Sequence, residues 1–207
     1  MTKPFRIAVL ASGNGTNLQA LIDQVHGADI EVVGVAASRS DARALARAER
    51  AGIESGVFAC TAGQDRDARD AALADWLDEL GTQLVVLAGW MELLNPAFIS
   101  RLAGRIINVH PSLLPAFPGL RAIEQAVAYG VKVTGVTVHF VDAGIDTGAI
   151  VLQEALELSY PAAIADIEQR VHSIEHRLLP RAVRLIAHGH VRLDPGNPRN
   201  VVIADGD

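Results

Sequence analysis

Short apolar runs alternate with stretches of helical periodicity through the first half of this chain. Short apolar runs bounded by turn residues favour buried strands, and apolar positions repeating with the helical period favour helices. We therefore expect strands at residues 6–11, 30–37, 55–59, 84–88 and 105–109, and helices at 16–25, 41–51, 67–80 and 96–102. Ser40 or Asp41 is expected to cap the second helix. This alternation predicts a mainly parallel sheet.

The pattern changes after residue 109. A loop rich in Pro and Leu leads to an expected helix at 122–128, and two closely spaced strands follow at 132–141 and 149–156. Such proximity favours an antiparallel or mixed edge. The longest helical pattern, 162–188, contains Pro180, which is expected to kink or split it. A short strand is expected near Val191, and the stretch 194–198 is expected to wrap the surface.

The predicted fold class is α/β: a Rossmann-like, mainly parallel sheet with helices on both faces and a mixed C-terminal edge. The chain has 207 residues, half of them hydrophobic, which is enough for one sizeable core. We expect a single domain over residues 1–207, with the tail 194–207 peripheral.

Charge and cysteine content narrow the possible partners. Lys and Arg form no run and the formal net charge is −6, so no nucleic-acid partner is expected. The single cysteine, Cys60, excludes an intramolecular disulfide and fits a reducing compartment. The apolar N-terminal run is too short for a membrane span and is broken at Gly13. We expect no membrane partner and a cytoplasmic location.

The turn Ser12-Gly13-Asn14-Gly15-Thr16-Asn17 lies between the first strand and the first helix. Glycines let backbone N–H groups approach an anion, and a helix N-terminus favours negative charge. A dinucleotide fingerprint is not met, because Leu18 stands where the third glycine belongs, and no Gly-Lys-Ser/Thr of a P-loop is present. The turn therefore favours a monophosphate site, with a plain tight turn as the alternative.

Asn108 and His110 leave the end of a buried strand two residues apart, so their side chains are expected to point the same way. An amide donor beside an imidazole suits acyl transfer, because one stabilises an oxyanion and the other moves a proton. The alternative is a hydrogen-bonded polar pair with no chemistry. The carboxyl end of a parallel strand, however, is where open α/β sheets bind ligands.

Two aspartates, Asp142 and Asp146, lie in a Gly-rich loop after the strand at 132–141. Aspartate is common in turns, so turn formation is one interpretation. The other is that one of them faces His110, where a carboxylate would orient the ring and favour the imidazolium. These residues alone do not choose between the two.

Two further segments are ambiguous. His172 to His176 reads His-Ser-Ile-Glu-His, which matches the His-x-x-Glu-His pattern of some zinc proteases, but no third ligand stands out. We expect no metal and favour a helix whose polar residues reach the active cleft. Residues 91–94 follow a buried strand and are mostly core, although they could wall an apolar slot for a flat ligand.

Taken together, these motifs closely resemble the 10-formyltetrahydrofolate-dependent formyltransferase family, from residue 6 to about residue 193. The resemblance rests on Asn-x-His-Pro-Ser-Leu-Leu-Pro at 108–115, on an Asp after the Val-His-Phe-Val strand, and on the turn 12–17. It implies that Asn108, His110 and Asp146 are catalytic. It also implies a set of residues that hold the phosphate and the ribonucleotide: Gly13, Asn14, Gly15, Thr16, Asn17, His172 and Glu175.

The same resemblance implies residues that border the folate: Arg66, Met91, Glu92, Leu93, Leu94, Asn108, Asp142, Ala143, Gly144, Ile145 and Asp146. The sequence departs from the family at two places. Glu92 stands where bacterial members often carry arginine, and the segment from Leu120 to Ile123 lacks a histidine that related proteins often have.

The implied reaction moves a formyl group from 10-formyltetrahydrofolate, a cosubstrate, to the glycine amine of N1-(5-phosphoribosyl)glycinamide in purine synthesis. The implied partners are small-molecule substrates, and the protein is expected as a monomer or homodimer. Two alternatives stay open: a 10-formyltetrahydrofolate hydrolase, and a nucleotide-binding module without catalysis. A hydrolase would carry an added amino-terminal domain, and a module would leave Asn108 and His110 without a role.

Overall fold

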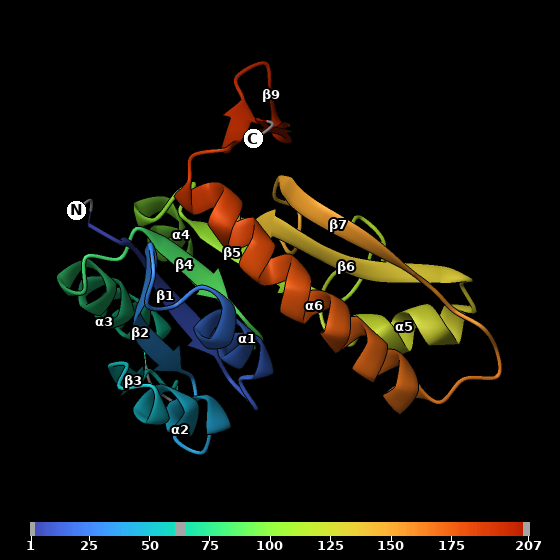
Figure 1. The fold of residues 1–207 in the computed structure, drawn as a ribbon, viewed down its shortest axis with the longest axis horizontal. Coiled ribbons are helices and arrows are strands. Elements are labelled where there is room, and N and C mark those ends of the chain that lie inside the picture. The colour runs from blue at the N-terminus through green and yellow to red at the C-terminus, as the bar shows by residue number, and fades with distance from the viewer. Residues whose placement is uncertain (1–2, 61–64, 205–207) are drawn as a thin grey trace. The chain divides into compact units, whose positions relative to one another are not determined.

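The computed structural model describes residues 3–60 and 65–204, which fold as α/β. Seven strands form a sheet in the order β3-β2-β1-β4-β5-β6-β7, and β8 and β9 form a second small sheet (Figure 1). The strands are β1 Phe5–Ala11, β2 Ile30–Ala37, β3 Ser55–Val57, β4 Leu84–Leu87, β5 Ile106–His110, β6 Val133–Phe140, β7 Ile150–Glu157, β8 Val191–Asp194 and β9 Asn197–Ile203. The helices are α1 Thr16–Gln24, α2 Arg43–Arg50, α3 Arg66–Glu79, α4 Pro96–Arg101, α5 Ala122–Tyr129 and α6 Ile164–Ala187.

The chain forms two compact units, one ending at Ile107 and the other beginning at Asn108. In the first unit β1 pairs in parallel with both β2 and β4, and β2 pairs in parallel with β3. The chain moves outward from β1 to β3 and then returns to β4. Right-handed crossovers therefore place α1 and α2 on one face and α3 on the other. This arrangement confirms the predicted parallel sheet with helices on both faces.

Close packing of α3 on the sheet depends on Gly34 in β2. A Cβ atom at this position would lie 2.7 Å from the ring of Trp76 and would also collide with Leu80. The missing side chain thus lets the helix approach the strand. The strands themselves are almost fully buried along β1 and β4, as expected for a sheet covered on both faces.

In the second unit β6 and β7 pair antiparallel, which confirms the mixed C-terminal edge. The long helix α6 lies along these two strands (Figure 1). The register between β6 and β7 shifts between Val138 and His139, where one residue of β7 is left over. Such bulges turn side chains in new directions, and this one lies beside the site described below.

Three expectations about elements are wrong. The side chains of Ser40 and Asp41 do not cap α2, because the helix begins later, at Arg43, behind Ala42 as the N-cap residue. Asp41 binds Arg39 instead. Of the two outcomes expected at Pro180, a kink or a split, the split does not occur: α6 runs through Pro180, which is buried in the apolar face that packs the helix onto its neighbours.

The third correction concerns the tail. The stretch after Asp194 does not wrap the surface but turns back into the hairpin of β8 and β9. Asp194 shapes the turn, since its Oδ1 accepts a hydrogen bond of 2.8 Å from the N–H of Gly196. Asp, Pro, Gly and Asn at residues 194–197 are all residues that favour such a tight turn.

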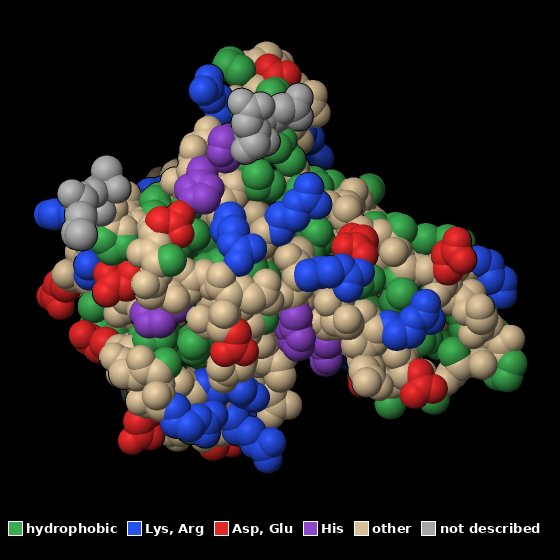
Figure 2. Space-filling view, viewed as in Figure 1, with side chains coloured by type: hydrophobic (Ala, Val, Ile, Leu, Met, Phe, Trp, Pro, Cys, Tyr) green, Lys and Arg blue, Asp and Glu red, His purple; other side chains and the backbone are tan. Residues whose placement is uncertain are grey.

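The surface carries its cations in local groups. Figure 2 shows arginines gathered over α2 and both arginines and histidines along α6. Among the residues that the structure describes, no helix combines the length and the apolar character needed to cross a membrane.

Candidate active site

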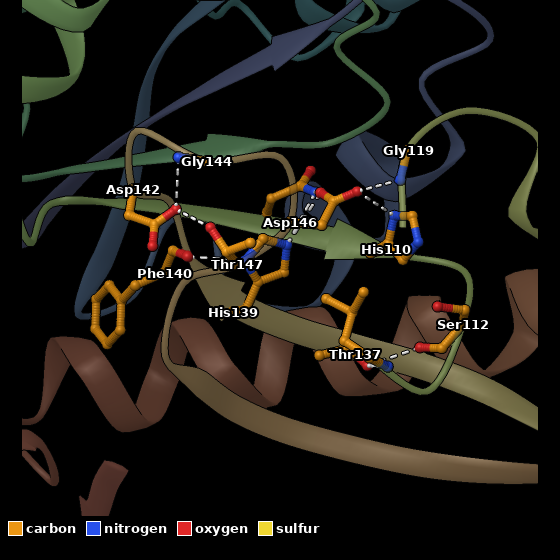
Figure 3. Close-up of polar contacts among 12 residues, drawn as sticks. His110, Ser112, Gly119, Thr137, His139, Phe140, Asp142, Gly144, Asp146 and Thr147 are labelled. Carbon is orange, nitrogen blue, oxygen red and sulfur yellow. Dashed lines mark hydrogen bonds and ion pairs between the residues drawn. The ribbon is translucent and has the colours of Figure 1, made fainter. Parts of the chain in front are cut away.

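Asp146 is the point on which the two polar residues of β5 converge. Its Oδ1 lies 3.4 Å from Nδ2 of Asn108, and its Oδ2 lies 3.3 Å from Nδ1 of His110. Figure 3 shows the carboxylate pointing toward the imidazole from the loop that follows β6. The alternation of side chains along β5 places Asn108 and His110 on the same side, as their two-residue spacing predicts.

The loop that follows β5 adds a backbone hydrogen bond to the carboxylate of Asp146. The N–H of Gly119 donates to Oδ2 of Asp146 at 2.7 Å (Figure 3). Asp146 itself has a φ of 52°, a left-handed conformation that is uncommon outside glycine and clusters at functional sites. The loop after β6 thus turns sharply at Asp146, whose side chain faces β5.

These contacts fix the charge state of Asp146. Burial, the largest single influence, acts to raise its pKa. Hydrogen bonds from His139 and Gly119, together with positive charge on His110 and His139, outweigh burial and lower the pKa from 3.8 to about 2. The group is therefore a carboxylate throughout the physiological pH range.

Both ring nitrogens of His110 face oxygen acceptors. Nδ1 faces the carboxylate of Asp146, and Nε2 lies 2.9 Å from the carbonyl oxygen of Phe117. A carbonyl oxygen only accepts hydrogen bonds, so both contacts are satisfied together when both nitrogens carry protons. The buried ring is thus held in one orientation between these two acceptors.

His139 completes the cluster, although no sequence motif assigns it a role there. Its Nε2 lies 3.2 Å from Nδ2 of Asn108 and 3.5 Å from Oδ1 of Asp146. Its Nδ1 lies 2.8 Å from the carbonyl oxygen of Phe140, which requires a proton on Nδ1. The available signal was a histidine on an otherwise apolar strand. The strand pattern alone does not show that its side chain lies beside Asn108 and Asp146.

Asp142, the other candidate carboxylate, holds the loop rather than His110. Its Oδ1 accepts hydrogen bonds from the N–H of Gly144 at 3.0 Å and from the hydroxyl of Thr147 at 2.6 Å (Figure 3). Gly148 closes the same loop, because a Cβ there would collide with the carbonyl of Phe140. The intervening residues Ala143, Gly144 and Ile145 are exposed, so the loop offers a surface beside Asp146.

The loop after β5 is fastened to β6 by Thr137. The hydroxyl of Thr137 donates to the carbonyl of Ser112 at 2.7 Å and accepts from the N–H of Leu114 at 3.1 Å. Gln153 donates to both Thr137 and the carbonyl of Leu114, each at 2.9 Å. These buried bonds fix the chain just beyond His110 and hence the path to Gly119.

In the first unit, the glycine-rich turn leads into α1 as the sequence predicts. Gly15 is the N-cap residue at a φ of 67°, and no side chain caps the helix. A Cβ at Gly15 would lie 2.8 Å from the Cα of Ala44, so glycine is required by conformation and by space. Arg47, which sequence analysis missed, donates to the carbonyl of Asn14 at 2.8 Å and brings positive charge to the turn.

The expected folate segment, residues 91–94, leaves the end of β4 in the same unit. Met91 and Leu93 are exposed, whereas Glu92 and Leu94 are half-buried. Arg66 is the first residue of α3. The next residue, Asp67, accepts a hydrogen bond of 2.7 Å from Nδ2 of Asn95, so the start of α3 lies beside the end of this segment.

His172 and Glu175 lie on α6 in the second unit. His172 is exposed beside a surface hollow of about 500 Å³, whereas Glu175 is buried. The rings of His172 and His176 stack with centroids 6.3 Å apart. Within residues 3–60 and 65–204, no three His, Cys, Asp or Glu side chains gather as a metal site requires.

Comparison with known proteins places this geometry in a family. The model of the formyl transferase family matches residues 5–183. The chain belongs to this family. A glycinamide ribonucleotide transformylase of known structure, from Symbiobacterium toebii, is 45% identical with a TM-score of 0.92, over 98% of this chain and 95% of that one.

Two sequence relatives agree with this assignment. Phosphoribosylglycinamide formyltransferase of Haemophilus influenzae is 40% identical over 91% of this chain and 90% of its own length. The trifunctional purine biosynthetic protein adenosine-3 of Bos taurus is 42% identical over 92% of this chain, which spans only 19% of that relative. The similarity to the formyl transferases thus extends over most of this chain.

Proposed function

We propose that this formyl transferase moves the formyl group of 10-formyltetrahydrofolate to the glycine amine of N1-(5-phosphoribosyl)glycinamide. The observation that carries the proposal is the carboxylate of Asp146, which faces both Asn108 and His110 at the end of β5. The names of the Haemophilus and Symbiobacterium relatives supply the substrate class. The folate acts as a cosubstrate that carries one carbon.

The reaction begins with attack of the amine nitrogen on the formyl carbon. A new C–N bond forms, and the C=O electron pair becomes an oxyanion. Asn108 and His110 donate hydrogen bonds to this oxygen, and losing one such donor typically costs ~10²–10³ in rate. The tetrahedral carbon then releases N10 of the folate. One proton leaves the attacking amine and one reaches N10, carried by His110 or by bound water.

Asp146 keeps His110 ready for this step. Its negative charge stabilises the imidazolium, and its position fixes the ring. For His110 to donate to substrate, one of its N–H groups must exchange a protein acceptor for the formyl oxygen. The carbonyl of Phe117 is the neutral of its two acceptors and therefore the one more easily replaced.

The ribonucleotide phosphate is assigned to the turn Gly13, Asn14, Gly15, Thr16 and Asn17. The uncapped start of α1 offers backbone N–H groups, and Arg47 adds charge. His172 and Glu175 are assigned to the rest of the ribonucleotide. The folate is assigned to Arg66, residues 91–94 and the loop 142–146, whose exposed apolar side chains suit a flat ring system.

One assay separates this proposal from the hydrolase alternative. Conversion of 10-formyltetrahydrofolate is followed by absorbance with and without the ribonucleotide. Transfer predicts turnover only when the ribonucleotide is present. Equal turnover without it would instead favour the hydrolase.

A further inference from the structure

A buried ion pair lies in α3. The side chains of Arg69 and Asp70 are only 5% and 0% exposed, and Nε of Arg69 lies 2.5 Å from Oδ1 of Asp70. Taking two charges out of water is costly, so such a pair seldom contributes much to stability by itself. Its other contacts therefore indicate what it holds in place.

Those contacts all reach one segment, residues 90–95. A terminal nitrogen of Arg69 donates to the carbonyl of Leu93 at 3.1 Å. The guanidinium carbon lies 5.6 Å from the centre of the Trp90 ring, within the range of a cation–π contact. Oδ2 of Asp70 accepts a hydrogen bond of 2.7 Å from the N–H of Asn95. The pair thus touches the start, the middle and the end of the segment.

A second hydrogen bond holds the start of this segment. The hydroxyl of Ser12, buried at the end of β1, accepts a hydrogen bond of 2.9 Å from the N–H of Met91. Ser38 in turn donates to Ser12 at 2.6 Å. The backbone of the segment is therefore held both by α3 and by the start of the phosphate turn.

What the segment presents to solvent is apolar. Met91 is 65% exposed and Leu93 is 63% exposed, although neighbouring Trp90 is buried. A free loop would be expected to bury such side chains against the protein. Here the fixed backbone keeps them outward. A ligand then meets a surface that is already ordered, so less of its binding free energy is lost to ordering the site.

We propose that Arg69 and Asp70 are positioning residues for the folate: they hold residues 91–94 in the conformation that receives it. This inference rests on the proposed function, which assigns the folate to that segment. It adds a positioning role for two buried residues that the proposed function assigns to neither substrate. The pair acts through the backbone at Leu93 and Asn95.

The test removes the Arg69–Asp70 ion pair without leaving one buried charge unpaired. The double variant Arg69→Met/Asp70→Leu replaces both charges with apolar groups of similar size, a change that buried pairs often tolerate. Asp70→Asn and Arg69→Lys serve as milder single changes if the double variant does not fold. The matched control is Arg101→Met, which removes the exposed ion pairs of α4 with Asp75 and Asp78 of the same helix α3.

The measurements are the dissociation constants of tetrahydrofolate and of the ribonucleotide, together with kcat and KM. In the double variant the folate constant and its KM should rise by about tenfold or more, as expected when an ordered site must be rebuilt on binding. The ribonucleotide constant and kcat at saturating folate should stay within about twofold of wild type. The folate dissociation constant of Arg69→Lys should lie between those of wild type and the double variant. An ammonium group keeps the charge but lacks the planar guanidinium that reaches both Asp70 and Leu93.

A second readout needs no ligand. In a Trp76→Phe background, the emission of Trp90 should shift to the red in the double variant, because the segment that carries the ring is no longer fixed and water reaches it, and should not shift in Arg101→Met. Unchanged folate affinity in a folded variant would overturn the inference while leaving the proposed function intact. An equal loss for both substrates would also overturn it, since the role would then be structural. Wild-type protein that does not bind tetrahydrofolate would overturn the proposed function itself, and this inference with it.

Discussion

At the scale of single residues, the site is organised around one carboxylate. Asp146 has contacts with Asn108, His110 and His139 and with the backbone of Gly119. Oδ1 faces Asn108 and His139, whereas Oδ2 faces His110 and the N–H of Gly119. Asp142, four residues earlier, accepts hydrogen bonds only from residues of its own loop among the contacts described above.

This division predicts different outcomes for two matched substitutions. Asp146→Asn should lower kcat by about 10²-fold or more while both substrates still bind, because the amide keeps the size but not the charge that favours the imidazolium. Asp142→Asn should change kcat by less than about tenfold. Steady-state kinetics and titrations of both variants provide the test. A crippled Asp142→Asn beside a nearly normal Asp146→Asn would mean that the carboxylates are assigned the wrong way round.

The lowered pKa of Asp146 also predicts how stability depends on pH. Its folded pKa of about 2 lies below the ordinary 3.8, so its contribution is fully present above 3.8 and is lost as the pH falls through about 2. The shift corresponds to roughly 2 kcal/mol. The gap in unfolding free energy between wild type and Asp146→Asn should therefore narrow by about this amount between pH 5 and pH 2. A gap that stays constant in denaturant titrations would show that the carboxylate is not stabilised as described.

Part of this site could be predicted from the sequence. Asn108 and His110 could be paired because side chains alternate along a strand. The choice between Asp142 and Asp146 required the path of an irregular loop, which no periodicity encodes. His139 was missed for a similar reason, since its contact with Asp146 also depends on the path of that loop.

At the scale of elements, the start of α1 is the part suited to an anion. The helix has a glycine as its N-cap residue and no acidic residue in its first turn. Arg47 approaches the same turn from α2. The element thus presents positive potential at the place where the phosphate is assigned.

Substitutions in this turn should separate the two substrates. Thr16→Val and Asn17→Ala should weaken the ribonucleotide by about tenfold, because each removes side-chain donors at a helix start, and should leave the folate almost unchanged. Titration with each substrate measures both effects. Equal losses for both ligands would assign the turn a structural role or would exchange the two sites.

Element boundaries were predicted to within a few residues where periodicity was strong, as in β2, where the expected 30–37 matches Ile30–Ala37. Local signals failed where tertiary packing decided the result. Helix α6 continues through Pro180 because its apolar face is buried on both sides of the proline. The hairpin of β8 and β9 depends on a turn that composition alone could not separate from a disordered tail.

At the scale of the whole molecule, the fold class followed from the alternation of strands and helices, and the reaction class from residues at the carboxyl end of β5. The chemistry proposed for Asn108 and His110 uses hydrogen-bond donors and a proton carrier. The His-x-x-Glu-His pattern on α6 was the competing signal. It has no third ligand side chain among the described residues.

Chelation tests that competing signal. Activity should survive prolonged treatment with a strong chelator, because the proposed steps use no Lewis acid. The measurement is the transfer rate before and after metal removal, with a metal analysis of the sample. Loss of activity that zinc restores would give His172 and His176 a metal role after all.

The central claim is that formyl transfer requires both substrates on this chain. The most direct measurement follows the absorbance of 10-formyltetrahydrofolate with purified protein, first alone and then with N1-(5-phosphoribosyl)glycinamide, and identifies the formylated product. We expect no appreciable turnover of the folate alone and stoichiometric product once the ribonucleotide is added. Turnover that proceeds equally without the ribonucleotide, releasing formate, would contradict it.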